Sequence, residues 1–258
     1  MQPLSFLELP QRRRGPNSGL RHSSGSTTAA GLRLGLGCLL AALFAVLAGW
    51  AHAHGVADSD AIYLQSQQGF TFWPYFYLGA KHMVTGYDHL LFLAGVIFFL
   101  YKISDITIYV TLFALGHSLT LVAGVWFDIP ANAYLIDAII GLSVVYKAFE
   151  NLGGFDRLGW SINTKAAVWV FGLFHGFGLA TKLQALTLSE DGLLGNLLAF
   201  NLGVEAGQLT ALVGIVALMN LWRASARFDS QAIIANGLLM TCGFVLIGYQ
   251  LTGYGLSI

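Results

Sequence analysis

Histidine and acidic side chains recur inside the most apolar stretches of this 258-residue sequence. The segment HMVTGYDHLLFL (82–93) carries His82, Asp88 and His89 at the head of an unbroken apolar run. Ionisable groups in apolar runs of this kind are rare, and they usually face a partner, a bundle interior or a substrate path. Three further candidate ligands stand deep in later apolar segments: His117, His175 and Glu205.

The spacing of these polar residues predicts shared helix faces. His82 and His89 are seven residues apart, so they lie on one face if a single helix contains both. One stripe with i, i+4 and i+7 spacing consists of Asn201, Glu205 and Gln208. Gly203 and Gly207 fall on the opposite side of that helix, where small residues let another helix approach closely. Gly172 and Gly176, which flank His175, predict a second close contact.

We expect the polar residues to lie at two depths in a membrane. With a rise of about 1.5 Å per residue, His117, His175 and Glu205 fall near the middle of their segments. Asp88 and His89 fall near the outer end of theirs, and Asp137 and Asn201 lie between the two levels. No basic residue is expected deep in the spans. Together these groups predict a path for a cation from the outer surface to the membrane centre.

Neutral imidazole and carboxylate ligands suit nickel, zinc, copper or iron, and thiolates are missing from the pattern. Each residue also has a purely structural interpretation. A single histidine can bond a neighbouring helix, Gln208 and Ser143 can join helices, and Asp137 can bond a serine. Lys147 and Glu150, at i and i+3, predict an interfacial ion pair.

The elements that must position these residues are membrane helices. The chain is 56% hydrophobic and 10% charged, with a mean hydropathy of +0.67, far from the composition of soluble domains. A bilayer core about 30 Å thick needs about 20 apolar residues per helix. We therefore predict an all-α polytopic membrane protein whose six-helix domain covers residues 84–258. The expected spans are 84–102, 106–127, 131–149, 166–184, 193–219 and 232–254.

The amino-terminal region has the features of a targeting segment. A basic leader precedes the apolar run LGLGCLLAALFAVLAGW (34–50), and Ala51-His52-Ala53 fits a small-x-small cleavage site. We expect residues 1–53 to be removed, with retention as an extra helix as the alternative. His54 would then be the new terminus and could offer its amino nitrogen and imidazole to a metal ion. Residues 54–83 are expected to form a periplasmic, interfacial segment.

Cations in the loops set the expected orientation. They gather after the first, third and fifth predicted spans, at Lys102, Arg157, Lys165, Arg223 and Arg227. The positive-inside rule therefore predicts that both mature termini are periplasmic and that the chain spans the bacterial inner (cytoplasmic) membrane several times.

Five motifs, in order, resemble the HupE/UreJ family of hydrogenase and urease accessory membrane proteins. They are HMVTGYDHLLFL (82–93), FALGHSLTL (113–121), DAIIGLSVVYKAFEN (137–151), FGLFHGFGLA (171–180) and FNLGVEAGQL (200–209). The resemblance implies a cleavable leader, six spans and nickel as the metal. It also implies metal residues at His82, Asp88, His89, His117, His175 and Glu205. Two positions depart from the family pattern: Asp137 replaces a glutamate, and Leu179 replaces a phenylalanine.

We therefore expect a permease that carries a divalent metal, Ni²⁺ first and copper, zinc or cobalt as alternatives, from periplasm to cytoplasm for metalloenzyme maturation. Asp137, Asn201 and Gln208 are expected to be second-shell or pathway groups. No nucleotide-binding loop is present, so ATP would not drive the chain unaided. One alternative is a non-transporting accessory or structural subunit of a larger membrane complex. The other is a membrane-embedded metalloenzyme. We do not expect an enzyme, because no nucleophile or acid–base pair accompanies the histidines.

Overall fold

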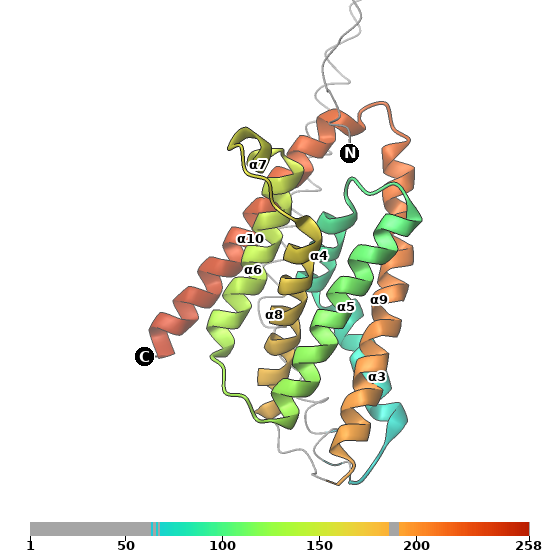
Figure 1. The fold of residues 1–258 in the computed structure, drawn as a ribbon, viewed down its shortest axis with the longest axis vertical. Helices are drawn as coiled ribbons and strands as arrows, with labels where there is room; N and C mark the ends of the chain where they lie inside the picture. Colours follow the sequence, from blue (N-terminus) through green and yellow to red (C-terminus); the bar gives the residue numbers. More distant parts are fainter. Residues whose placement is uncertain (1–62, 64–65, 67, 186–190, 258) are drawn as a thin grey trace, which may run out of the picture. The chain divides into compact units, whose positions relative to one another are not determined.

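The computed structural model describes residues 63, 66, 68–185 and 191–257, and this part of the chain is built from helices (Figure 1). The predicted leader, its cleavage site and His54 lie outside the described residues. The helices are α3 (Phe72–Thr85), α4 (Tyr87–Ile97), α5 (Ile103–Trp126), α6 (Ala133–Asn151), α7 (Gly154–Arg157), α8 (Thr164–Gln184), α9 (Leu193–Arg223) and α10 (Phe228–Ser257).

Polar caps mark where two of the apolar helices begin. The side chain of Asn132 accepts a hydrogen bond from the Leu135 amide at 3.2 Å, and Asn163 accepts one from the Ala166 amide at 3.2 Å. Asparagine at an N-cap satisfies an amide that has no partner inside its own helix. These caps separate α6 and α8 from the loops that precede them.

Short connections make successive long helices run in opposite directions, so the loops gather at two ends. The loops after α4, α6 and α9 lie at one end, together with α7, and we call this the α7 end (Figure 1). The loop between α5 and α6 and the start of α3 lie at the opposite end. The cationic residues that predicted the orientation are therefore brought together at the α7 end.

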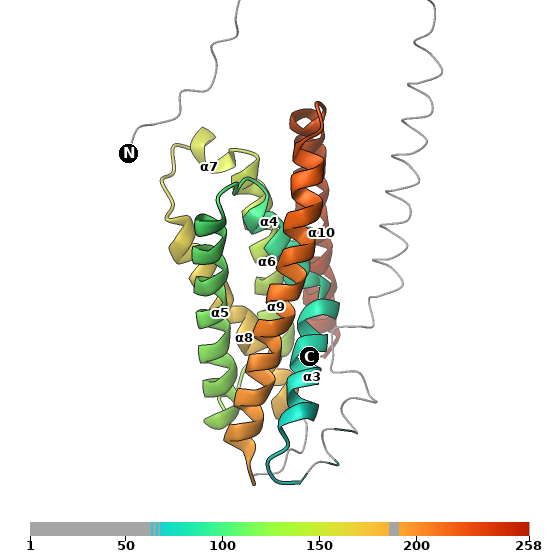
Figure 2. The same ribbon diagram turned by 90° about the vertical axis from the view of Figure 1, so that its right-hand side faces the viewer.

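Helices α3 and α9 lie side by side, as both views show (Figures 1 and 2), and glycines line their contact. A Cβ atom on Gly203 would collide with the carbonyl oxygen of Phe76, and one on Gly207 would lie 2.6 Å from that of Ala80. Gly79 meets the backbone of Phe200 in the same way. Backbones at this separation exclude any side chain, so the predicted close contact at Gly203 and Gly207 is confirmed.

Two more helix pairs are also in close contact through glycines. In the α5–α8 pair, a Cβ atom on Gly116 would lie 2.6 Å from the carbonyl oxygen of Trp169, and Gly176 lies against the carbonyl of His117. This confirms the second predicted contact. In the α6–α10 pair, a Cβ atom on Gly141 would lie 3.2 Å from the carbonyl oxygen of Gly243.

The expected first span, 84–102, differs from the structure. Helix α3 already begins at Phe72, inside the segment expected to be interfacial, and the chain breaks at Gly86 before α4 continues to Ile97. Gly86 has an extended backbone, with φ −74° and ψ 96°, and its amide bonds the carbonyl of His82 at 2.8 Å. The apolar pattern predicted where the apolar segment begins. It did not predict that another helix, α3, precedes this segment and is separated from α4 by the single residue Gly86.

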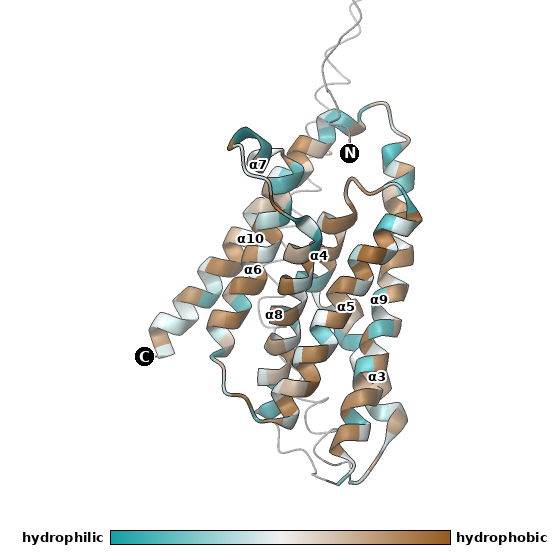
Figure 3. Cartoon of the chain, in the orientation of Figure 1, coloured by the Kyte–Doolittle hydropathy of each residue, from teal (hydrophilic) through white to brown (hydrophobic). Residues whose placement is uncertain are grey.

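Hydrophobic residues make up much of each long helix, and α7 and the turn between α9 and α10 are largely hydrophilic (Figure 3). Leu119 on α5, Val213 on α9 and Phe244 on α10 are each more than half exposed. A water-facing surface would not carry so many large apolar groups, whereas a lipid-facing surface would.

Four of the described helices are long and apolar enough to cross a membrane: α5, α8, α9 and α10. The multi-pass, all-helical class predicted from the sequence is therefore confirmed. Helix α4, with 11 residues, is too short to cross alone. Helix α6 has 19 residues but carries Asp137, Lys147 and Glu150, so charge rather than length sets it apart. The count of six spans stays a prediction.

Candidate metal centre

Four histidines from four helices meet in the interior of the bundle. His89 on α4 is their centre: its ring centroid lies 5.0 Å from that of His175 on α8 and 5.8 Å from that of His117 on α5. The ring of His82 on α3 lies 5.2 Å from that of His89. His89, His117 and His175 are at most 3% exposed. We call these four residues the histidine cluster.

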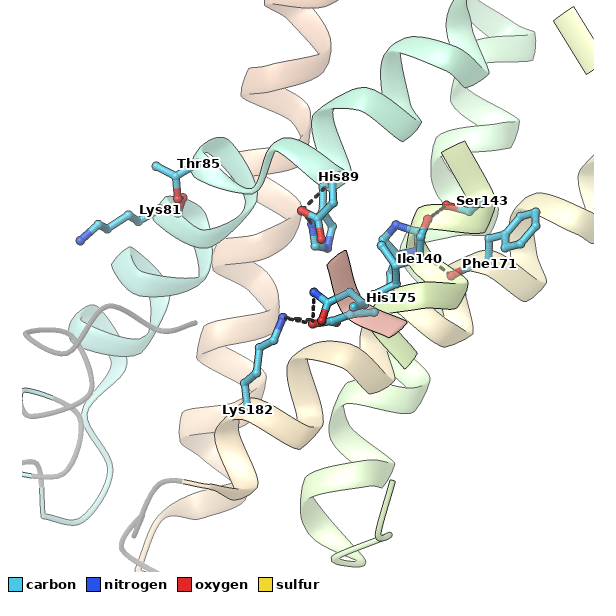
Figure 4. Close-up of polar contacts among 11 residues, drawn as sticks. Lys81, Thr85, His89, Ile140, Ser143, Phe171, His175 and Lys182 are labelled. Carbon is cyan, nitrogen blue, oxygen red and sulfur yellow. Dashed lines mark hydrogen bonds and ion pairs between the residues drawn. The ribbon is translucent and has the colours of Figure 1, made fainter. Parts of the chain in front are cut away.

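Hydrogen bonds assign the protons on two of the imidazoles. The Nδ1 atom of His89 lies 2.9 Å from Asp88 Oδ1, and that of His175 lies 2.8 Å from the Phe171 carbonyl oxygen. Both partners accept, so both Nδ1 atoms carry the proton, and each ring presents a lone pair at Nε2 when that atom is unprotonated. Figure 4 shows the His89 and His175 side chains with these contacts. A second ring nitrogen held in this way is the usual support of a histidine ligand.

Five of the other six ring nitrogens of the cluster are buried and have no hydrogen-bond partner among the described residues. They are His82 Nε2, His89 Nε2, His117 Nδ1, His117 Nε2 and His175 Nε2. Each buried nitrogen left without a hydrogen bond costs about 1–3 kcal/mol. Such a concentration of unpaired lone pairs is what a cation-binding site would relieve.

The ring separations suit a shared metal ion, although the donors are not yet aligned on one. Metal–nitrogen bonds of about 2.1 Å place the centroids of two ligand rings about 5 Å apart. The part of the chain that the structure describes holds no group of three or more His, Cys, Asp or Glu side chains already arranged to hold a metal. Binding would therefore require the rings to rotate.

The prediction of two depths was wrong for the histidines. His89 contacts the same rings that were expected near the membrane centre, so it does not form a separate outer site. The reason is the break at Gly86. Since α3 carries the chain into the bundle first, α4 begins in the interior, and residues 88 and 89 are already deep.

One turn from each of three histidines, on the α7 side, stands a phenylalanine. Phe92 follows His89 on α4, which runs toward the α7 end, and Phe113 and Phe171 precede His117 and His175 on helices that run away from it. The Phe92 centroid lies 5.3 Å from that of Phe113 and 5.9 Å from that of Phe171. This aromatic layer separates the histidine cluster from the α7 end. In the sequence, each phenylalanine stands three or four residues from a cluster histidine, and this spacing could have predicted the layer.

The polar stripe of α9 lies against α5. Glu205 Oε1 is 3.4 Å from both Ser118 Oγ and Asn201 Nδ2, and Asn201 Nδ2 donates to Ser118 Oγ at 2.8 Å. Gln208 Nε2 donates to the carbonyl of Val110 at 3.5 Å, so it joins two helices. Glu205 is linked to the cluster through Ser118, the chain neighbour of His117.

Asp137, near the start of α6, has a basic partner in Lys182, which lies in the last turn of α8. Lys182 Nζ lies 3.3 Å from Asp137 Oδ2, and the two side chains are 18% and 8% exposed. Gln250 Nε2 donates to the same oxygen at 3.4 Å. Lys182 is seven residues from His175 on the same face of α8, a spacing that we overlooked.

Two structural interpretations can also be compared with the contacts. Lys147 Nζ pairs with Glu150 Oε2 at 2.6 Å, which confirms the predicted i, i+3 ion pair. The hydroxyl of Ser143 donates to the Ile140 carbonyl of its own helix at 2.6 Å, so this bond does not join two helices.

The described fold and this interior histidine cluster define a multi-pass helical membrane protein with a polar centre. Comparison with protein families finds a match to the family described as "HupE / UreJ protein" over residues 58–258. The match covers most of the chain, so the protein belongs to the HupE/UreJ family, which is associated with nickel or cobalt accessory or transport functions. Comparisons with curated proteins and with solved structures found no match.

Proposed function

We propose that this protein is a permease for a divalent transition metal, with Ni²⁺ as its main substrate. The observation that carries the proposal is the set of unpartnered imidazole nitrogens in the histidine cluster. Neutral imidazole binds nickel well, and the family's association with nickel and cobalt favours these ions over zinc and copper.

In this proposal, His89, His117 and His175 bind the ion through rings that rotate toward a common point, and His82 receives it on the α3 side. Asp88 holds the imidazole of His89 and raises its basicity, as carboxylates do behind histidine ligands. Glu205 supplies negative charge from α9 through the Ser118 contact. Asn201 and Gln208 keep α9 in register with α5.

The break at Gly86 supports a transport role. Discontinuous helices are typical of transporter binding sites, where irregular backbone is tolerated because it lines a polar cavity. We propose that α3 and α4 together make one crossing and that α5, α6, α8, α9 and α10 make the other five. This restores the predicted six spans.

We further propose that the α7 end is cytoplasmic and that both ends of the mature chain face the periplasm of a bacterial inner membrane. The loop cations at the α7 end support this orientation through the positive-inside rule. An ion moving inward would then reach the histidine cluster before the aromatic layer. The aromatic layer therefore has to open to release the ion. On the cytoplasmic side, the released ion would be available for metalloenzyme maturation.

Uptake of radiolabelled Ni²⁺ into proteoliposomes tests the proposal. His117→Ala and His175→Ala should each abolish uptake and nickel binding. Tyr146→Phe removes a buried hydroxyl without a described partner outside the cluster, and it should transport normally. Unchanged uptake in both histidine variants would exclude this site.

The main alternative is an accessory subunit of a larger membrane complex, in which the polar residues only join helices. Gln208 does join helices, but the imidazole nitrogens that have no partner among the described residues contribute nothing to such a role. Purification at fixed stoichiometry with a partner, without bound metal, would favour this alternative. We rank a membrane-embedded metalloenzyme third, because the acidic groups beside the histidines, Asp88 and Glu205, are both engaged in hydrogen bonds with neighbouring side chains.

A further inference from the structure

The ion pair between Asp137 on α6 and Lys182 on α8 has long contacts, although both side chains are mostly buried. Lys182 Nζ lies 3.3 and 3.4 Å from the two carboxylate oxygens of Asp137. Charge-assisted bonds of this type usually measure about 2.7–2.9 Å. Both groups are mostly buried, so each needs compensation, yet neither is tightly held by the other.

The contact between Asp137 and α8 depends on Gly178. A Cβ atom on Gly178 would lie 3.2 Å from Asp137 Oδ1 and 2.7 Å from Ile140 Cδ1. Its absence lets the Asp137 carboxylate approach the α8 backbone, one turn from Lys182. The pair therefore depends on the packing of α6 against α8 and not on two flexible surface chains.

Lys182 also lies on the side of α8 that carries a residue of the histidine cluster. It lies two turns from His175 on the same face of α8, toward the end opposite α7. Its ammonium interacts electrostatically with His82, Asp88 and His175. Figure 4 shows the Lys182 side chain extending from α8 toward the region of His89 and His175. Asp137 and Lys182 therefore lie between the cluster and the end of the bundle opposite α7.

An ammonium in this position has two opposite effects on a divalent cation. It occupies the carboxylate that would attract the ion, and its own charge repels an ion bound to the histidines. Lysine carries its charge as a point on a flexible four-carbon stem, so its ammonium can leave the carboxylate by rotation of the side chain alone.

We propose that Lys182 is a tethered competitor of the transported metal. It neutralises Asp137 while the histidine cluster is empty and moves away when a divalent cation binds, so it lowers the affinity and speeds release. This inference rests on the proposed metal-binding function. It makes Lys182 a residue that sets affinity rather than a ligand.

The test is the dissociation constant of Ni²⁺ for the purified protein, measured by calorimetry, with turnover in proteoliposomes as a second readout. Lys182→Met should bind Ni²⁺ on the order of tenfold more tightly and turn over more slowly, because the repelling charge is gone. Lys165→Met removes an exposed cation from the first turn of the same helix, and it should match the wild type.

A second comparison covers the case in which loss of the Lys182 charge beside Asp137 prevents Lys182→Met from folding. Asp137→Asn should bind nickel more weakly, since Lys182 is left uncompensated beside the cluster. Adding Lys182→Met to Asp137→Asn should restore tighter binding. Equal affinity with and without Lys182, in either background, overturns the inference. If the wild-type protein itself fails to bind nickel, the proposed function fails instead, so the two failures are distinguishable.

Discussion

The contact between Asp88 and His89 leads to a quantitative prediction for Asp88→Asn. In the structure, Asp88 Oδ1 accepts from both the backbone amide of His89, at 3.0 Å, and its Nδ1 atom, at 2.9 Å. Asparagine can still accept a hydrogen bond from Nδ1 but lacks the charge that makes the bond strong and the ring basic. Loss of such a supporting partner typically weakens metal binding by about 10- to 100-fold. This corresponds to about 1.4–2.8 kcal/mol.

The assay is titration of purified Asp88→Asn and His89→Ala with Ni²⁺. Asp156→Asn serves as a matched control, because Asp156 is exposed on α7 and is not part of the histidine cluster. We expect the dissociation constant of Asp88→Asn to fall between those of the wild type and His89→Ala. Wild-type affinity in Asp88→Asn would refute the orienting role. Binding lost as completely as in His89→Ala would show that the carboxylate itself is a ligand.

Three further predictions concern packing, the aromatic layer and α9. Gly203→Val should lower the thermal unfolding midpoint by an amount equivalent to about 1–3 kcal/mol, because its side chain would collide with the Phe76 carbonyl. Gly214→Val, where no neighbour lies within 4 Å, should leave the midpoint unchanged, and equal midpoints for both variants would contradict the packing argument. Phe92→Ala should increase the passive leak of metal ions into proteoliposomes, because it removes one ring of the aromatic layer. An unchanged leak rate would mean that this layer is not the barrier to the ion. Glu205→Gln should weaken nickel binding less than any histidine-to-alanine change in the cluster, since Glu205 contacts Ser118 and Asn201, and an equal loss in calorimetry would make it a direct ligand.

The sequence was sufficient for features that depend on one helix at a time. Composition and apolar run length predicted the multi-pass helical class. Glycine spacing predicted the close helix contacts at Gly203 and Gly207, and i, i+3 spacing predicted the Lys147–Glu150 pair. These features follow from the helical period and from the size of side chains, which are both local properties.

Only the tertiary structure showed which helix faces meet. The break at Gly86 carries His89 into the interior, where it contacts His117 and His175 instead of standing at the surface. The packing of α6 against α8 brings Lys182 to Asp137, although 45 residues separate them in the chain. Helical periodicity places a residue on a face, but the depth of that face and its neighbour depend on how separate helices pack. That is why the ligand types of this site were predictable from the sequence, and why their convergence on one cluster was not.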